Sequence, residues 1–190
     1  RLTQVEEFDG SGISQSVSRY VYDALNRRIL KDVDGEVTGT IYSFNTAWAD
    51  VDGTESVTAR YLPSGQIDEF FARWRPGEGT SWYLTDRLGT VRDLADETGT
   101  VVNHVDYDSF GNIVSESGAS FGDRFKFTGR EYDPETGLYY YRARYYDPTL
   151  GRFISEDPLG FAGGDANLQR YVANDPLNAT DPSGLQAIAS

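Results

Sequence analysis

The residues best suited to chemistry are aspartates in two copies of one short turn. Residues 157–161 read DPLGF and residues 181–185 read DPSGL. Two carboxyl groups can act as an acid and a base when they lie close enough for their repulsion to leave one of them protonated. An Asp before Pro also caps backbone amides in a turn, and the Gly that follows supplies a positive φ. Taken alone, the pattern predicts two capped turns.

The sequence lacks the residues that most other catalytic and metal-binding sites need. The chain has no Cys, which excludes disulfides, thiolate zinc sites and Cys nucleophiles. His104 is the one histidine, so a Ser-His-Asp triad would have to use it. It lies in a strand-like run, and no Gly-x-Ser-x-Gly elbow supports a serine hydrolase. Residues 32–36 (DVDGE) resemble part of a calcium loop, but the missing distal Glu makes a hairpin turn the better prediction. We therefore expect no cofactor and no metal.

Charge narrows the class of partner. The formal net charge is −13, from 30 acidic and 17 basic side chains, so phosphate backbones would repel the chain and no nucleic-acid partner is expected. Residues 139–146 (YYYRARYY) could be imagined as a stacking platform for single-stranded nucleic acid. The acidic chain instead favours a buried strand with paired arginines. No segment has the roughly 18 apolar residues of a membrane helix. The arginines expected to pair with nearby carboxylates are Arg130, Arg142, Arg144 and Arg152.

Turn signals at hairpin spacing predict an all-β chain. The sequence has 20 Gly, 7 Pro and 13 Tyr, and tyrosine suits half-buried strand faces. Asp-Gly between β-branched residues at 33–37 is a strong hairpin signal. A single hairpin is marginal alone, so repeated hairpins imply one extended sheet. A looser repeat, in which a Tyr precedes a short turn, starts at Tyr22, Tyr61, Tyr83 and Tyr107.

The last third of the chain carries a resemblance to a known family. Residues 125–185 combine five Asp-Pro dipeptides with the run GLYYYRARYYDPTLGRF at 137–153 and the closing DPSGL. This segment resembles the C-terminal RHS repeat-associated core of RHS (rearrangement hotspot) or YD-repeat proteins. The Tyr-containing units upstream look like YD repeats, in which Tyr ends a strand and Asp begins the turn. The resemblance implies the end of a β-sheet shell that encloses the protein's own C-terminal cargo, often a polymorphic toxin.

The resemblance also implies a reaction. In self-cleaving family members the chain is cut just after DPxGL, and acidic residues of the core are thought to act as in aspartic proteases. By position, the cut would separate Leu185 from Gln186, with Asp157 and Asp181 as the carboxylates. Any enzymatic activity would therefore be self-cleavage, with substrate and catalyst tethered in one chain. Three other aspartates remain rivals: Asp147, Asp165 and Asp175.

We therefore expect an all-β fold in two parts. Residues 1–117 would form an antiparallel strip of YD-type hairpins, and residues 118–190 a compact β-rich core plug. One short helix is predicted over residues 165–174, where Asp165 is an N-cap candidate. The family resemblance places the protein outside the cell or at its surface. The alternative function is an adhesion module that binds cell-surface carbohydrate or protein without catalysis.

Overall fold

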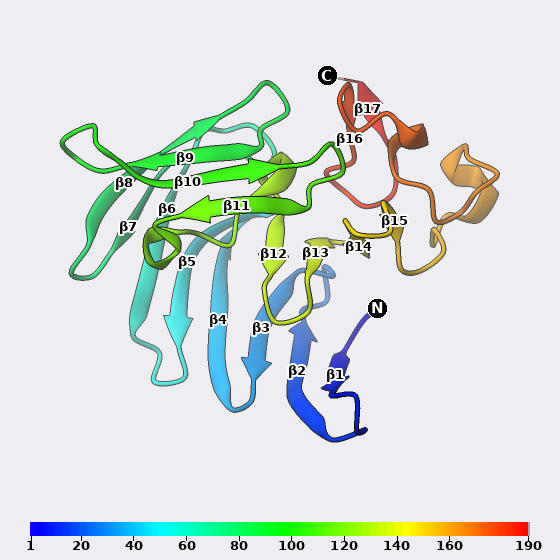
Figure 1. Ribbon diagram of the computed structural model, residues 1–190, viewed down its shortest axis with the longest axis horizontal. Coiled ribbons are helices and arrows are strands. Elements are labelled where there is room, and N and C mark those ends of the chain that lie inside the picture. Colours follow the sequence, from blue (N-terminus) through cyan, green and yellow to red (C-terminus); the bar gives the residue numbers. More distant parts are fainter. Residues whose placement is uncertain (190) are drawn as a thin grey trace.

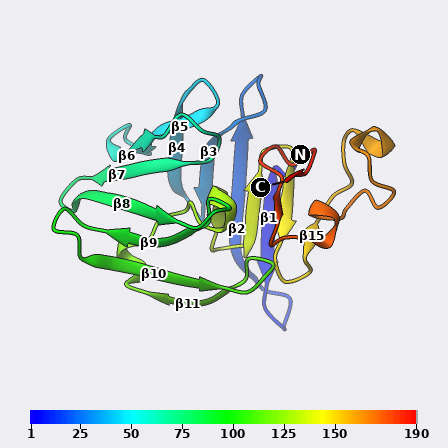
Figure 2. The same cartoon turned by 90° about the horizontal axis from the view of Figure 1, so that it is seen from above.

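The chain forms a long curved sheet with a compact plug on its concave side. A computed structural model describes residues 1–189. Figure 1 shows the early strands running nearly upright and the later strands nearly crosswise, with the plug strands β12–β15 beside them. Figure 2, seen from above, shows how the sheet curls around one side. The all-β prediction is confirmed, since residues 1–189 form strands and short 3₁₀ turns, and their strand pairs are antiparallel.

The large sheet is a meander in which each strand pairs with its neighbours in the chain. Its eleven strands are β1 (Gln4–Phe8), β2 (Ser14–Tyr22), β3 (Arg28–Val33), β4 (Glu36–Ser43), β5 (Thr46–Asp52), β6 (Val57–Pro63), β7 (Phe70–Arg75), β8 (Gly79–Thr85), β9 (Val91–Ala95), β10 (Val101–Tyr107) and β11 (Ile113–Ser117). The plug contains β12 (Glu131–Asp133), β13 (Leu138–Tyr141), β14 (Arg144–Asp147) and β15 (Arg152–Phe153), followed by the pair β16 (Ala179–Thr180) and β17 (Ile188–Ala189). Four short 3₁₀ turns complete the chain: η1 (Ala119–Phe121), η2 (Phe127–Gly129), η3 (Gly160–Gly163) and η4 (Val172–Asn174).

One aspartate-centred turn closes six of the hairpins. In the turn after β9, Asp96 Oδ1 accepts hydrogen bonds from the amides of Thr98 at 2.8 Å and Thr100 at 3.0 Å. Gly99, three residues after the aspartate, has a φ of 84°, a conformation that glycine adopts without strain. Within the turn, the carboxylate thus accepts the amide hydrogen bonds that a carbonyl of a neighbouring strand would otherwise accept. The same pair of amide contacts is made by Asp9, Asp23, Asp52, Asp86 and Asp108.

Aromatic rings join the plug to the concave face of the sheet. Phe125, at the start of the plug, lies 4.4 Å from the Phe70 ring and 5.1 Å from the Tyr61 ring, measured between centroids. These three side chains are buried in one cluster with Tyr83. Burial of such rings stabilises a fold by roughly 1.5–3 kcal/mol each, so the plug contributes much of the core that a single sheet lacks.

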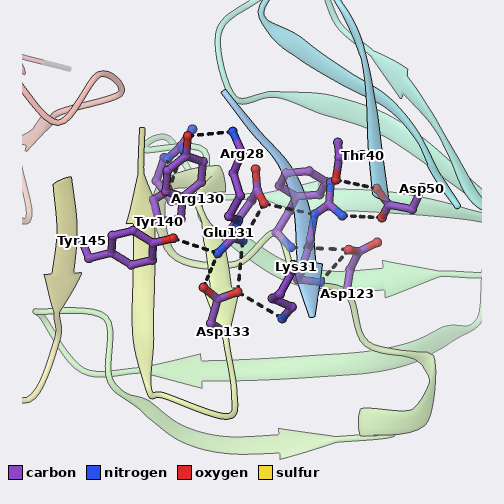
Figure 3. A network of polar contacts seen from close by, with 12 residues as sticks. Arg28, Lys31, Thr40, Asp50, Asp123, Arg130, Glu131, Asp133, Tyr140 and Tyr145 are labelled. Atoms are coloured by element: carbon purple, nitrogen blue, oxygen red, sulfur yellow. Dashed lines mark hydrogen bonds and ion pairs between the residues drawn. The ribbon is translucent and has the colours of Figure 1, made fainter. Parts of the chain in front are cut away.

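A buried ion-pair network crosses the same boundary (Figure 3). Arg28 of β3 pairs with Asp133 and, at 3.0 Å, with Glu131, both from β12. Lys31 adds a contact of 3.1 Å to Asp133, and Arg124 pairs with Asp50 of β5. All of these acids come within reach of a cation, as buried charges require.

The charge state of this network is set by its arginines. Burial of Glu131 opposes its ionisation, but the guanidinium groups of Arg124, Arg28 and Arg130 outweigh burial and bring the pKa of Glu131 to about 2. The carboxylate therefore stays ionised at neutral pH. The predicted division into residues 1–117 and 118–190 stays a prediction, because the two parts share this one network.

The helix predicted over residues 165–174 is wrong. The chain there bends instead, and only η4 (Val172–Asn174) makes a 3₁₀ turn, with positive φ at all three residues. The Leu168 carbonyl accepts a hydrogen bond from the Asp157 amide, and Arg170 forms an isolated β-bridge with Arg152. These long-range contacts take the backbone groups that a helix would pair internally, so tertiary context overrides propensity. Among residues 1–189, no helix has the length and apolar content needed to cross a membrane.

We predict that Arg28→Leu destabilises the chain by about 3–5 kcal/mol, because it leaves Asp133 and Glu131 buried with less compensating charge. Denaturant unfolding measures the loss. The matched control is Arg19→Leu, which removes an exposed 3.6 Å pair with Asp32 and should change stability by less than about 0.5 kcal/mol. Equal effects of the two substitutions would contradict the assigned importance of the buried network.

The aspartate turns predict an acid-labile component of stability. Hydrogen bonds from a threonine hydroxyl, and then from backbone amides, hold the pKa of Asp52 and Asp96 below the ordinary value. Their contribution is therefore complete above the unfolded pKa of about 3.9 and is lost as pH falls through the lower folded pKa. We expect Asp52→Asn/Asp96→Asn, which keeps the acceptor oxygens, to flatten the fall of melting temperature below about pH 4. The assignment would be refuted if the melting temperatures of the two proteins fell equally as the pH is lowered.

Candidate active site

The structure brings the two DPxG turns together at one pocket. The Asp157 and Asp181 side chains are 8% and 3% exposed, and both line a cavity of about 310 Å³. Leu185 and Gln186, the residues on either side of the predicted cut, line the same cavity. Although the two turns are far apart in the sequence, both carboxylates and the peptide bond lie around one solvent-accessible space.

Arg144 connects the two carboxylates. Its Nη2 atom lies 3.2 Å from Asp157 Oδ2 and 3.4 Å from Asp181 Oδ2. One guanidinium group thus contacts both acids, so their Oδ2 atoms cannot be farther apart than the sum of these distances. Burial lowers the pKa of Arg144, and the Asp157 and Asp181 carboxylates oppose that effect only in part.

The remaining donors of Arg144 hold the backbone around the pocket. Nε donates to the Gly184 carbonyl at 2.5 Å and Nη1 donates to the Leu168 carbonyl at 2.9 Å. The guanidinium carbon lies 3.7 Å from the centre of the Phe153 ring, which fixes its plane from one side. A planar group with five donors suits this task, and no other side chain could reach as many acceptors.

The second turn docks on the hairpin that carries Arg144. Gly184 has a φ of 68°, and a Cβ there would lie 2.2 Å from the Tyr141 carbonyl oxygen, so only glycine fits. The Ala143 amide donates to the Ser183 carbonyl at 3.2 Å. The hairpin of β13 and β14 therefore positions both the arginine and the DPSGL turn.

Asp181 also holds the peptide that the sequence predicts to be cut. Its Oδ1 atom accepts from the amides of Leu185 and Gln186, each at 3.1 Å, and from the Ser183 hydroxyl at 3.1 Å. Asp157 caps the Leu159 amide at 2.7 Å through Oδ1. The capping roles expected from the local pattern are confirmed, and Oδ2 of each acid still faces Arg144.

The rival aspartates are engaged elsewhere. Asp147 caps the amides of Thr149 and Leu150, and Asp175 accepts from the Asn178 side chain. Asp165 does line the pocket, but both of its oxygens accept from Arg170 at 2.7 Å. Asp157 and Asp181 are the two acids that share one cation beside the Leu185–Gln186 bond.

His104 contacts two acidic side chains. Nδ1 lies 2.6 Å from Asp93 and Nε2 lies 3.4 Å from Asp106, so both ring nitrogens face carboxylates on the sheet surface. The hydrogen bond with Asp93 raises the pKa of His104. Among residues 1–189, no three acidic or histidine side chains are arranged to hold a metal ion.

The arginine-rich run is confirmed as a buried strand pair. Arg130 and Arg142 both bind Asp68, at 2.6 and 2.5 Å, and Arg144 binds the two site aspartates. Arg152 differs, because its partner is the Gln169 side chain. The sequence predicted that Arg144 meets a carboxylate, but nothing in it says that both site acids share this one side chain.

Comparison with known proteins now identifies the family. The model of the Teneurin YD-shell family matches residues 11–174. The tRNA nuclease WapA of Bacillus subtilis is 34% identical over 182 residues, and the match covers 91% of this chain and 8% of that protein. The toxin protein Tse5 of Pseudomonas aeruginosa is 32% identical, with 88% of this chain and 15% of that protein covered. The chain thus spans a small part of these relatives.

Solved structures show the same fold. The crystal structure of TcdB2-TccC3-Cdc42 superposes with a TM-score of 0.70 at 24% identity, covering 96% of this chain and 10% of that one. The Tc holotoxin pore of Photorhabdus luminescens gives a TM-score of 0.71 at 23% identity, over 98% of this chain and 10% of that one. With the family match over most of its length, the chain belongs to the Teneurin YD-shell family, the RHS and YD-repeat shell proteins.

Proposed function

We propose that this segment closes a YD-repeat shell around a C-terminal cargo and cuts its own chain after Leu185. The observation that carries the proposal is the meeting of Asp157, Asp181 and the Leu185–Gln186 peptide at one pocket. The curved sheet, with the plug held to it by buried ion pairs, suits the closed end of a shell wall. Relatives that are named as a nuclease and as toxins support a cargo that follows the cut, outside the cell or at its surface.

The chemistry is hydrolysis by a pair of carboxyl groups. An ionised carboxylate takes a proton from water, and a protonated one supplies a proton to the peptide that is cut. Asp181 lies four residues from the scissile bond and already holds its nitrogen, so no substrate has to be captured from solution. Such tethering replaces a binding step and can contribute several kcal/mol to the rate.

Arg144 makes this pair possible in a buried place. Two ionised carboxylates at short distance repel each other, and their removal from water costs further free energy. The guanidinium group offsets the cost of burying an ionised carboxylate through its contacts of 3.2 and 3.4 Å, while repulsion between the two acids still favours one proton on the pair. It also holds the Gly184 carbonyl, one residue before Leu185, and so fixes the substrate strand against the acids.

We predict that the chain, extended at its C-terminus by a folded reporter domain, yields two fragments on a denaturing gel, split after Leu185. Asp157→Asn and Asp181→Asn should each leave one band, because an amide can neither take nor give the proton. Intact mass identifies the bond. Asp175→Asn is the control and should be cut like the parent, since Asp175 lies outside the pocket. A single uncut band from the parent protein would remove the enzymatic proposal.

We predict that Arg144→Lys loses most of its cleavage while losing less stability than Arg144→Ala. Lysine keeps the charge but lacks the planar fork that reaches two carboxylates and two carbonyls. Arg144→Ala leaves two buried acids without a cation, at a cost of about 3–5 kcal/mol. Cleavage rate and denaturant unfolding are measured on both variants. Cleavage of Arg144→Lys at the parental rate would show that charge alone suffices.

A further inference from the structure

The chain stays on the plug after the bond that is predicted to be cut. Residues 188–189 form β17, which lies antiparallel to β16 with Thr180 opposite Ile188 and Ala179 opposite Ala189. Figure 1 shows the two strands beside each other at the far end of the plug. The segment downstream of Leu185 therefore has a strand partner of its own, apart from the groups that line the pocket.

This downstream segment is held by its backbone. The side chains of residues 186–189 are all exposed, and Ile188 is 52% exposed. The main chain is held at two points, by the hydrogen bond of 3.1 Å from the Gln186 amide to Asp181 Oδ1 and by the ladder with β16. A strand ladder joins amide and carbonyl groups, so it leaves the identity of exposed side chains free.

β16 is fixed in place by contacts that do not involve β17. The Ala179 amide donates to the Asp175 carbonyl at 3.1 Å. From the turn after β8, Arg87 donates to the Leu177 carbonyl and, at 2.9 Å, to Asn178 Oδ1. Within residues 1–189, β16 pairs with no strand other than β17. A short strand held in this way offers its amide and carbonyl groups to an added peptide strand.

We infer that β16 is a binding edge for an extended peptide, whose ligand is the chain downstream of Leu185, bound through its backbone whatever its side chains. This inference rests on the proposed self-cleavage, because it describes how the part of the substrate beyond the cut is positioned. Asp181 holds the nitrogen of the bond from within its own turn, and β16 holds the strand that follows. Contacts at both points keep the scissile peptide in one place beside the acids.

Backbone binding excludes one residue type from the bound strand. In an antiparallel ladder alternate residues exchange hydrogen bonds with their partners, so either Ile188 or Ala189 donates its amide to β16. Proline has no amide hydrogen and cannot donate at that position. At the other position the amide points away from β16, so proline there leaves the ladder its hydrogen bonds.

The cut weakens the contact that positions the substrate. While the chain is intact, the segment is tethered at Leu185, and its effective concentration beside β16 is high. After the cut, the ladder at Ile188 and Ala189 has to hold a separate molecule against the loss of that molecule's free motion. β16 therefore holds the substrate strand and lets the product strand leave.

The first test measures the binding edge without cleavage. Amide hydrogen exchange is followed by NMR in the full 190-residue chain carrying Asp157→Asn, which keeps the bond intact. We expect the amide of either Ile188 or Ala189 to exchange about tenfold more slowly than in an unstructured peptide, and Ile188→Thr to keep this protection. Exchange of both amides at the unstructured rate would overturn the binding edge. Loss of protection in Ile188→Thr would show that the side chain is read.

The second test measures cleavage of the chain extended by the folded reporter domain. Ile188→Pro and Ala189→Pro are compared, and the two substitutions serve as controls for each other. We expect proline at the protected amide to slow cleavage about tenfold relative to proline at its neighbour, because the substrate strand loses its position. Equal cleavage rates would overturn positioning by β16. A parent chain that is never cut would overturn the proposed function, and the exchange measurement would still decide whether β16 binds the strand.

Discussion

The structure depends on pairing buried carboxylates with arginines across the concave face of the sheet. A single curved sheet has one face that must be covered, and here the cover is polar as well as aromatic. Arg28 reaches from β3 to Glu131 and Asp133 of the plug, while Arg124 reaches back from the plug to Asp50 of β5. Because each ion would be costly alone, these pairs make sheet and plug stabilise each other.

Buried carboxylates are also paired with an arginine at the candidate active site, but with fewer cations for each acid. In the network at Arg28, the carboxylates of Glu131 and Asp133 are enclosed with several cations, and the pKa of Glu131 falls to about 2. At the site, one guanidinium serves two acids, and a cavity of about 310 Å³ lies beside them. Fewer cations and access to water are the conditions under which a carboxyl group can exchange protons.

Local chemistry made the repetitive part of the fold predictable. The Asp and Gly of each turn, as at Asp96 and Gly99, carry their own hydrogen bonds and positive φ, so sequence alone places the hairpins. The helix prediction for residues 165–174 failed for the opposite reason. Its apolar spacing suits a helix, but the Leu168 carbonyl binds Asp157 and Arg144 from elsewhere in the chain. Contacts between distant residues leave no local signal.

The site, too, was predictable only where the signal is local in the sequence. The resemblance in the C-terminal segment singled out Asp157 and Asp181, but the role of Arg144 as their common partner depends on how two separate turns fold onto one hairpin.

Capping and catalysis are not competing explanations for the DPSGL turn. A cap requires the Asp181 oxygen to accept from amides further along the chain, and the amides it accepts from are those of Leu185 and Gln186. The same hydrogen bonds that close the turn therefore carry the next peptide bond to the carboxyl group. In the proposed self-cleavage, a second acid and a shared cation are brought to the open side of this turn. In this fold the first DPxG turn, with Asp157, and the β13–β14 hairpin, with Arg144, supply the acid and the cation.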